Sequence, residues 1–205
     1  GWSAGGNLAA VVSQLARDNG GPALSGQLLL TPVTDGSRKW PSYTGNGAGY
    51  ILTEPLMDWF WDHYATPEQR KDPKASPLLA KSLAGLPPAA IITGDFDPLR
   101  DEGDEYARRL VDAGVPVVHR TYPGQFHGFF TMGKLLPQAN VAVREIGDWL
   151  KVNGEAIYGT RTAGRSHQWT TGKRQTQEYG EFMVKYNLMD QVGQESKNGV
   201  AVKQV

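Results

Sequence analysis

The chain has 205 residues, equal numbers of basic and acidic side chains (21 of each) and no cysteine. This length accommodates one domain with a sizeable core and is too short for two large ones. The balanced charge gives no reason to expect a nucleic acid or a membrane surface as partner. Lack of cysteine excludes disulfides, thiol catalysis and thiolate metal sites, and it favours a cytoplasmic location without proving one. No apolar run approaches the roughly 20 residues that span a bilayer, and an oligomer is possible.

The first predicted element is an amphipathic helix that begins near Asn7 and ends in the turn residues 18–21. Its apolar positions at helical spacing are Leu8, Val11, Val12 and Leu15. Residues 27–33 (QLLLTPV) are typical of a strand buried on both faces of a parallel sheet. Residues 35–50 are rich in Gly, Ser and Asn, which predicts a loop or lid.

A second predicted helix follows Thr53, whose hydroxyl can cap it. Its aromatic-rich face would suit the cover of a pocket. That face consists of Leu56, Trp59, Phe60 and Tyr64. Taken as a set, the aromatic residues Trp59, Phe60, Trp61 and Tyr64 are open to two interpretations, plain core or acyl pocket.

The next predicted elements are a buried strand at 89–93, a helix at 101–113 ended by Gly114, a strand at 115–122 and a helix at 137–150. Strands that alternate with helices predict an α/β fold with a mostly parallel sheet and helices on both faces.

The character of the sequence changes near residue 150, where Gly, Gln, Thr, Lys and Asn begin to dominate. We therefore predict a partial catalytic domain at 1–150 and a tail of uncertain structure at 151–205. Within the tail only the alternating apolar residues of 182–188 could form one strand or part of a helix.

The first five residues, Gly1-Trp2-Ser3-Ala4-Gly5, fit the G-x-S-x-G turn that presents a nucleophilic serine between a strand and a helix. The glycines are expected because backbone comes very close on both sides of the serine. The backbone N–H of Ala4 could donate to an oxyanion. The alternative interpretation of Ser3 is a helix cap.

A nucleophilic serine needs a base, and the base needs an acid that orients it. Asp97 follows the strand at 89–93 and His127 follows the strand at 115–122, so both lie at carboxyl ends of parallel strands. Pro98 gives the loop a sharp exit, which favours Asp97 over Asp95. The other rival carboxylates that could be solvated or capping are Asp101 and Asp104.

The remaining histidines, His63, His119 and His167, are predicted to be structural or exposed to solvent. His127 itself stands among phenylalanines, an environment that is more often structural. Its position where a base is needed favours the functional interpretation.

Five segments together resemble the hormone-sensitive-lipase family of esterases, bacterial family IV: GWSAGGNLAA, LLLTPVTD, SPLLA at 76–80, GDFDPLRDEG and YPGQFHGFF. The likeness runs from Gly1 to about Trp149. It implies the C-terminal half of an α/β-hydrolase fold, with Asp97 of D-P-L as acid and His127 of H-G-F as base. It also implies hydrolysis of short to medium acyl esters through an acyl-enzyme on Ser3, with no cofactor.

Two departures from that family bear on activity. Trp2 stands where the family most often has an acid. The family's H-G-G-G oxyanion loop and first strands precede the nucleophile, and this sequence shows neither. Since one oxyanion donor can be worth about 10²–10³ in rate, we expect this chain to be inactive or poorly folded unless complemented.

Residues 147–161 (GDWLKVNGEAIYGTR) resemble the segment that closes the barrel of family 29 α-L-fucosidases. No paired carboxylates of a glycosidase accompany it. The alternatives to an esterase are therefore a peptidase or acyltransferase with the same triad, a non-catalytic binding module of this fold and, least favoured, a glycosidase fragment.

Overall fold

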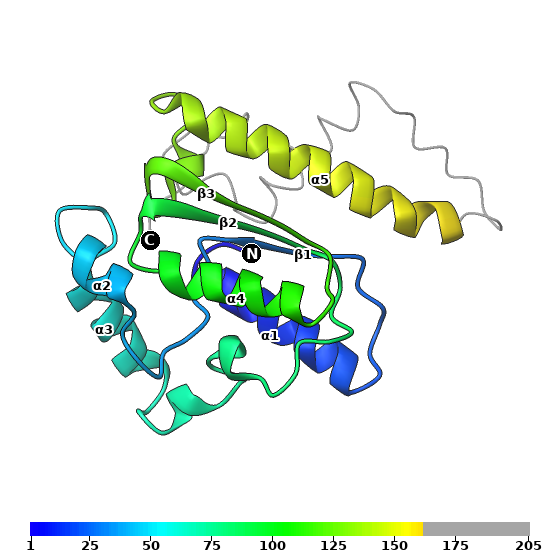
Figure 1. Ribbon diagram of the computed structural model, residues 1–205, viewed down its shortest axis with the longest axis horizontal. Coiled ribbons are helices and arrows are strands. Elements are labelled where there is room, and N and C mark those ends of the chain that lie inside the picture. The colour runs from blue at the N-terminus through cyan, green and yellow to red at the C-terminus, as the bar shows by residue number, and fades with distance from the viewer. Residues whose placement is uncertain (162–205) are drawn as a thin grey trace, which may run out of the picture. The chain divides into compact units, whose positions relative to one another are not determined.

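The computed structural model describes residues 1–161, and its centre is a parallel three-stranded sheet in the order β1-β2-β3 (Figure 1). The strands are β1 (Gln27–Leu30), β2 (Ala89–Phe96) and β3 (Val117–Phe126). Gln27 pairs with Ala89, and Ala89 pairs in turn with Val117. Trp2 forms a parallel bridge with Leu30, so the residues before Ser3 lie beside β1.

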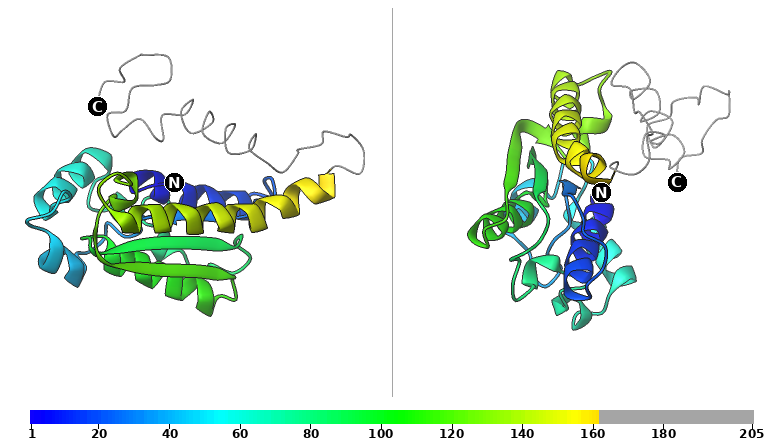
Figure 2. Two further views of the ribbon diagram at one scale, coloured as in Figure 1. Left: turned by 90° about the horizontal axis from the view of Figure 1, so that it is seen from above. Right: turned by 90° about the vertical axis from the view of Figure 1, so that its right-hand side faces the viewer.

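Helices cover both faces of this sheet (Figures 1 and 2). The helices α1 (Ala4–Asp18) and α4 (Arg100–Asp112) pack on one face, where Leu29 and Ile91 join Ala10 and Tyr106 in a buried cluster. The helix α5 (Pro137–Arg161) packs on the other face, where Ile92 meets Ala139, Ala142 and Ile146. Successive strand residues point to opposite faces, so a strand such as Ala89–Ile92 is apolar throughout. The predicted α/β fold with a parallel sheet covered on both faces is confirmed.

The first predicted strand ends earlier than expected, at Leu30 rather than Val33. Thr31 has a φ of 41°, which turns the chain out of the sheet. Pro32 has no N–H to continue the ladder. Val33 donates its N–H to the carbonyl of Ser3 at 3.3 Å, so the end of β1 folds back onto the turn that carries the serine.

The helix α1 forms where predicted, but its buried face is not the predicted one. Of the predicted apolar face only Val11 is buried, while Leu8, Val12 and Leu15 are exposed. The buried side instead carries Gly6 and Ala10, which allow close approach to the sheet, together with polar Asn7 and Gln14. Those two amides are satisfied because they donate to backbone carbonyls, Asn7 to Val33 and Ala75 and Gln14 to Pro77.

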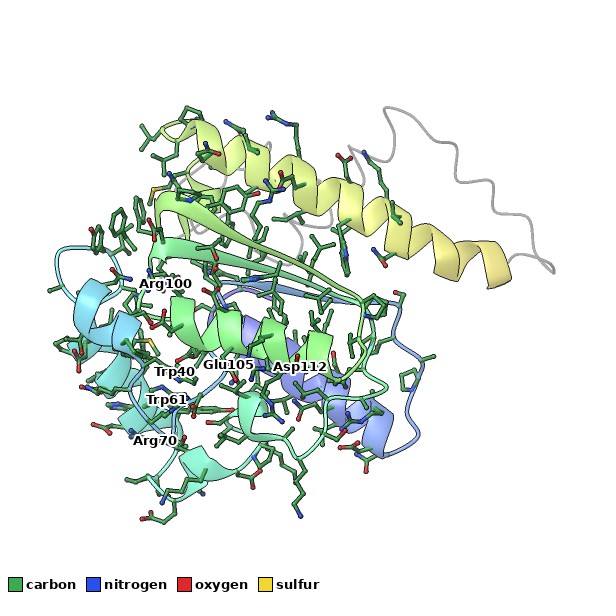
Figure 3. All side chains as sticks on the ribbon, in the orientation of Figure 1. Trp40, Trp61, Arg70, Arg100, Glu105 and Asp112 are labelled. Atoms are coloured by element: carbon green, nitrogen blue, oxygen red, sulfur yellow. The ribbon has the colours of Figure 1, made fainter. Side chains whose placement is uncertain are left out.

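The segment 35–50 is not entirely loop, because it contains the short helix α2 (Pro41–Asn46), which begins at a proline. The helix α3 (Glu54–Tyr64) follows, and the Thr53 hydroxyl accepts the Leu56 N–H as its cap. The predicted pocket-covering face of α3 is wrong. Its buried side is Met57 and Trp61, with the Arg70 guanidinium 5.8 Å from the Trp61 ring centroid (Figure 3).

The other three residues of the aromatic set, Trp59, Phe60 and Tyr64, are exposed, so they form neither core nor pocket among the described residues. The 3-10 turns of the chain are η1 (Gln69–Lys71), η2 (Pro77–Leu79) and η3 (Phe129–Thr131).

The helix α5 is longer than the predicted 137–150, because it continues to Arg161. Residues Gly1–Ile157 form one compact unit, and the domain boundary near 150 stays a prediction. The fucosidase-like residues 147–161 lie within α5, whereas His167 and residues 182–188 lie outside the described part of the chain. Within that part no helix is both long and apolar enough to cross a bilayer.

Candidate active site

Ser3 lies in a strained turn between the Trp2 bridge and the first residue of α1. Its φ is 53°, a conformation that costs a non-glycine residue about 1–3 kcal/mol. Two hydrogen bonds to the end of β1 hold it, since Ser3 donates its N–H to the Leu30 carbonyl at 2.9 Å and accepts the Val33 N–H. The Ser3 side chain makes no capping hydrogen bond to α1. Its hydroxyl is therefore available to other groups.

The glycines around Ser3 do not all serve the same purpose. A Cβ on Gly1 would lie 2.0 Å from the Gly5 carbonyl oxygen, so this position requires glycine. A Cβ on Gly5 would meet nothing within 4 Å, and the expectation of close backbone on that side is wrong. The close approach occurs one residue later, where a Cβ on Gly6 would lie 2.9 Å from Pro32 Cβ.

The structure brings Ser3, His127 and Asp97 into one line. His127 Nε2 lies 3.1 Å from Ser3 Oγ, and His127 Nδ1 lies 2.8 Å from Asp97 Oδ2. The other Asp97 oxygen accepts the Leu99 N–H at 2.9 Å, which fixes the carboxylate plane. Asp97 is fully buried and His127 is 7% exposed. Asp97 and His127 directly follow β2 and β3, so the topology alone explains why residues 30 and 124 positions apart meet.

The rival carboxylates are engaged elsewhere. Asp95 forms an ion pair with Arg100 at 3.4 Å, and Asp101 binds the same guanidinium at 2.9 Å. Asp104 accepts hydrogen bonds from His119 and Thr93, both at 2.9 Å.

Two of the remaining histidines lie in the described part. His63 is exposed on α3, where it stacks on Trp59. His119 binds Asp104. Of the three histidines described, only His127 contacts the serine.

Sequence reasoning missed a clamp on the loop that carries Asp97. Asn46, at the end of α2, donates its amide to the carbonyl oxygens of Asp95 at 3.0 Å and Asp97 at 3.3 Å. Ser42, at the start of the same helix, donates its hydroxyl to the Pro98 carbonyl at 2.5 Å. The segment that was predicted as a lid therefore fixes the backbone on both sides of the acid. A polar residue in a glycine-rich stretch gives no sequence signal of such a contact.

A second buried carboxyl, Glu102 in the first turn of α4, holds the opposite side of this loop. Glu102 Oε1 accepts the N–H of Thr34 at 2.7 Å, and the Thr34 hydroxyl donates to the Glu102 carbonyl at 2.8 Å. Burial raises the pKa of Glu102 well above its usual range, although the backbone hydrogen bonds act in the opposite direction. Glu102 thus joins the segment after β1 to the helix that follows Asp97.

The parallel sheet with helices on both faces, together with a serine at positive φ that contacts a histidine and an aspartate in the order Ser-Asp-His, defines the α/β-hydrolase class. Residues 1–131 match the family described as having the alpha/beta hydrolase fold, and the chain belongs to this family. Among residues 1–161 no group of three or more potential metal ligands is present.

The relatives of the chain are ester hydrolases. It is 47% identical over 141 residues to the carboxylic ester hydrolase LipN of Mycobacterium tuberculosis, which covers 66% of this chain and 38% of LipN. It is 41% identical to the ethyl acetate hydrolase of Pseudomonas putida, over 68% of this chain and 45% of that enzyme. The crystal structure of a thermostable esterase from Pseudomonas putida is similar with a TM-score of 0.72 at 47% identity, over 75% of this chain and 50% of that one. The chain thus spans half or less of the length of these relatives.

Proposed function

We propose that this chain carries the nucleophile, base and acid of a serine carboxylic ester hydrolase, in the roles Ser3, His127 and Asp97. The observation that carries the proposal is the continuous line of hydrogen bonds from Ser3 Oγ through the imidazole to the buried Asp97 carboxylate. A serine is a weak nucleophile by itself, and a positioned base is what makes it attack a carbonyl carbon.

The reaction follows from this geometry. Nε2 of His127 removes the Ser3 proton as Oγ bonds to the ester carbonyl carbon, and the protonated imidazole then donates that proton to the departing alcohol. Water, deprotonated by the same nitrogen, attacks the resulting acyl-enzyme and releases the acid. Asp97 holds Nδ1–H, which keeps Nε2 free to accept a proton and stabilises the imidazolium.

The proposed oxyanion donor on this chain is the backbone N–H of Ala4. Ala4 is the first residue of α1, so its N–H has no partner within the helix, and the positive end of the helix dipole lies there. Loss of one such donor typically costs about 10²–10³ in rate. The catalytic rate of this chain should therefore depend strongly on how many donors surround the oxyanion.

The proposed substrates are carboxylic esters with short to medium acyl chains. The support is that the relatives include one protein described as a carboxylic ester hydrolase and another described as an ethyl acetate hydrolase, at 47% and 41% identity. A peptidase or acyltransferase would use the same three residues, so the test includes an amide substrate and an alcohol acceptor.

The test is hydrolysis of p-nitrophenyl butyrate and of its anilide analogue, with and without added methanol, by the chain and by Ser3→Ala. Ser13→Ala is the matched control, since Ser13 lies on the same helix and donates to the Ala9 carbonyl away from the site. We expect ester turnover that Ser3→Ala abolishes and Ser13→Ala retains. Equal turnover by Ser3→Ala, or no turnover by the unaltered chain, would count against the proposal. Faster anilide cleavage would favour a peptidase, and faster transfer to methanol an acyltransferase.

A further inference from the structure

Trp2, the residue directly before the serine, has no role in the reaction as derived above, yet its indole lies beside the base. The ring centroids of Trp2 and His127 are 6.0 Å apart, with 32° between the ring planes. The backbone bridge of Trp2 to Leu30 fixes where the indole starts. We propose that Trp2 is a positioning residue that holds the His127 ring in the orientation which joins Ser3 to Asp97. The proposal rests on the function proposed above.

The hydrogen bonds of His127 leave one motion of the ring unrestrained. Both bonds are made by ring nitrogens, one to Asp97 and one to Ser3. These two contacts define an axis through the ring, and rotation about that axis stretches neither bond. A planar group beside the ring restrains this rotation because the ring would collide with it. The tilted indole of Trp2 is placed to provide this restraint.

Other aromatic rings hold the indole itself in place. Phe130 meets Trp2 edge to face, with centroids 5.5 Å apart and planes at 82°. Phe130 in turn packs on Phe129 at 5.8 Å, and Phe129 is fully buried against Tyr122. Tyr122 belongs to β3, so this chain of rings joins Trp2 to the sheet. Such edge-to-face and tilted contacts are favourable beyond the apolar area they bury.

The residue after the base also accommodates the indole. Gly128 has a φ of 75°, and a Cβ at this position would lie 2.8 Å from Trp2 Cζ2. The glycine therefore allows the turn after His127 to lie directly against the tryptophan. The Trp2 Nε1–H is buried and has no acceptor within residues 1–161. A buried donor without a partner is unfavourable, so the indole occupies this place for its shape rather than for a hydrogen bond.

The test compares Trp2→Phe, which keeps an aromatic ring beside the imidazole, with Trp2→Leu, which keeps apolar volume without a planar ring. Trp59→Leu is the matched control, because Trp59 stacks on a histidine away from the site, His63, at 4.2 Å. Thermal unfolding shows whether each variant folds. We expect Trp2→Leu to lower kcat for p-nitrophenyl butyrate about 10- to 100-fold with KM changed less than about 2-fold, while Trp2→Phe and Trp59→Leu stay within about 3-fold of the unaltered chain.

A second measurement does not depend on turnover. The proton that His127 Nδ1 shares with Asp97 gives a far-downfield proton NMR signal, which His127→Gln removes and so assigns. We expect this signal to persist in Trp2→Phe and Trp59→Leu, and to broaden or vanish in a folded Trp2→Leu chain. An unchanged signal together with unchanged kcat in folded Trp2→Leu would overturn the positioning role. A signal that responds to Trp2→Leu in a chain without esterase turnover would support positioning while contradicting the proposed function.

Discussion

The Asn46→Ala substitution tests whether α2 fixes the loop that carries the acid. Asn46 is buried and donates to two backbone carbonyls, at 3.0 and 3.3 Å. A hydrogen bond contributes about 0.5–1.5 kcal/mol net, and a buried acceptor left without a donor costs about 1–3 kcal/mol. The second bond is long, so we expect a total loss of about 2–3 kcal/mol in the free energy of unfolding. Because the released carbonyls flank Asp97, we also expect kcat/KM to fall about 10-fold.

The assay for this substitution is urea unfolding followed by tryptophan fluorescence, combined with esterase kinetics below the transition. Asn140→Ala is the matched control, since Asn140 donates to the Gly133 carbonyl at 2.7 Å on the surface. It should lose no more than about 0.5 kcal/mol and keep its activity. If Asn46→Ala lost no more stability and no more activity than Asn140→Ala, the clamp would not hold the acid loop.

Three further predictions address the buried acid, the glycines and the choice of carboxylate. The raised pKa of Glu102 means that its contribution to stability is present below the usual glutamate pKa of about 4.3 and is lost as the pH rises towards the folded-state pKa. Glu102→Gln should therefore gain urea stability relative to the unaltered chain between pH 5 and pH 8, and an equal difference at both pH values would contradict this. Gly6→Ala should cost about 1–3 kcal/mol by overpacking in thermal unfolding, whereas Gly5→Ala should be neutral or stabilising by up to about 1 kcal/mol; similar costs for both would refute the assignment of the close contact. Asp97→Asn should lower kcat/KM about 10³–10⁴-fold and Asp95→Asn less than about 3-fold, and the reverse ranking would make Asp95 the acid.

The sequence located the three site residues because their positions follow from topology. A strand that is apolar throughout ends where its sheet ends, and parallel strands bring their carboxyl ends to the same edge. Asp97 and His127 each follow such a strand, and Ser3 precedes a helix. The geometry between the three side chains therefore follows from the order of elements together with the strained turn at Ser3.

The buried face of α1 could not be predicted in the same way. Large apolar residues at helical spacing identify a helix, but the side that packs depends on how closely the helix approaches its neighbour. Gly6 and Ala10 allow the close approach. Asn7 and Gln14 are tolerated on that side only because carbonyl oxygens of distant residues accept their amide protons. Those acceptors are 68 and 63 positions away in the sequence.

The clamp formed by α2 depends on contacts of the same kind. Asn46 meets the acid loop 49 and 51 residues later. Glu102 similarly accepts from a residue 68 positions earlier. A single side chain whose partner is a backbone atom leaves no pattern in the sequence, because every residue except proline offers the same donor and acceptor. Such contacts are visible only after the chain has folded.

The most direct test of the central proposal is covalent labelling of the chain with a fluorophosphonate, followed by mass spectrometry of its peptides. Such a reagent reacts with a serine whose neighbouring base has made it nucleophilic. We predict one label, on the peptide that contains Ser3, at a rate that falls at least about 10³-fold in His127→Gln. Labelling elsewhere, no labelling, or an unchanged rate in His127→Gln would contradict the assignment of Ser3 as a nucleophile activated by His127.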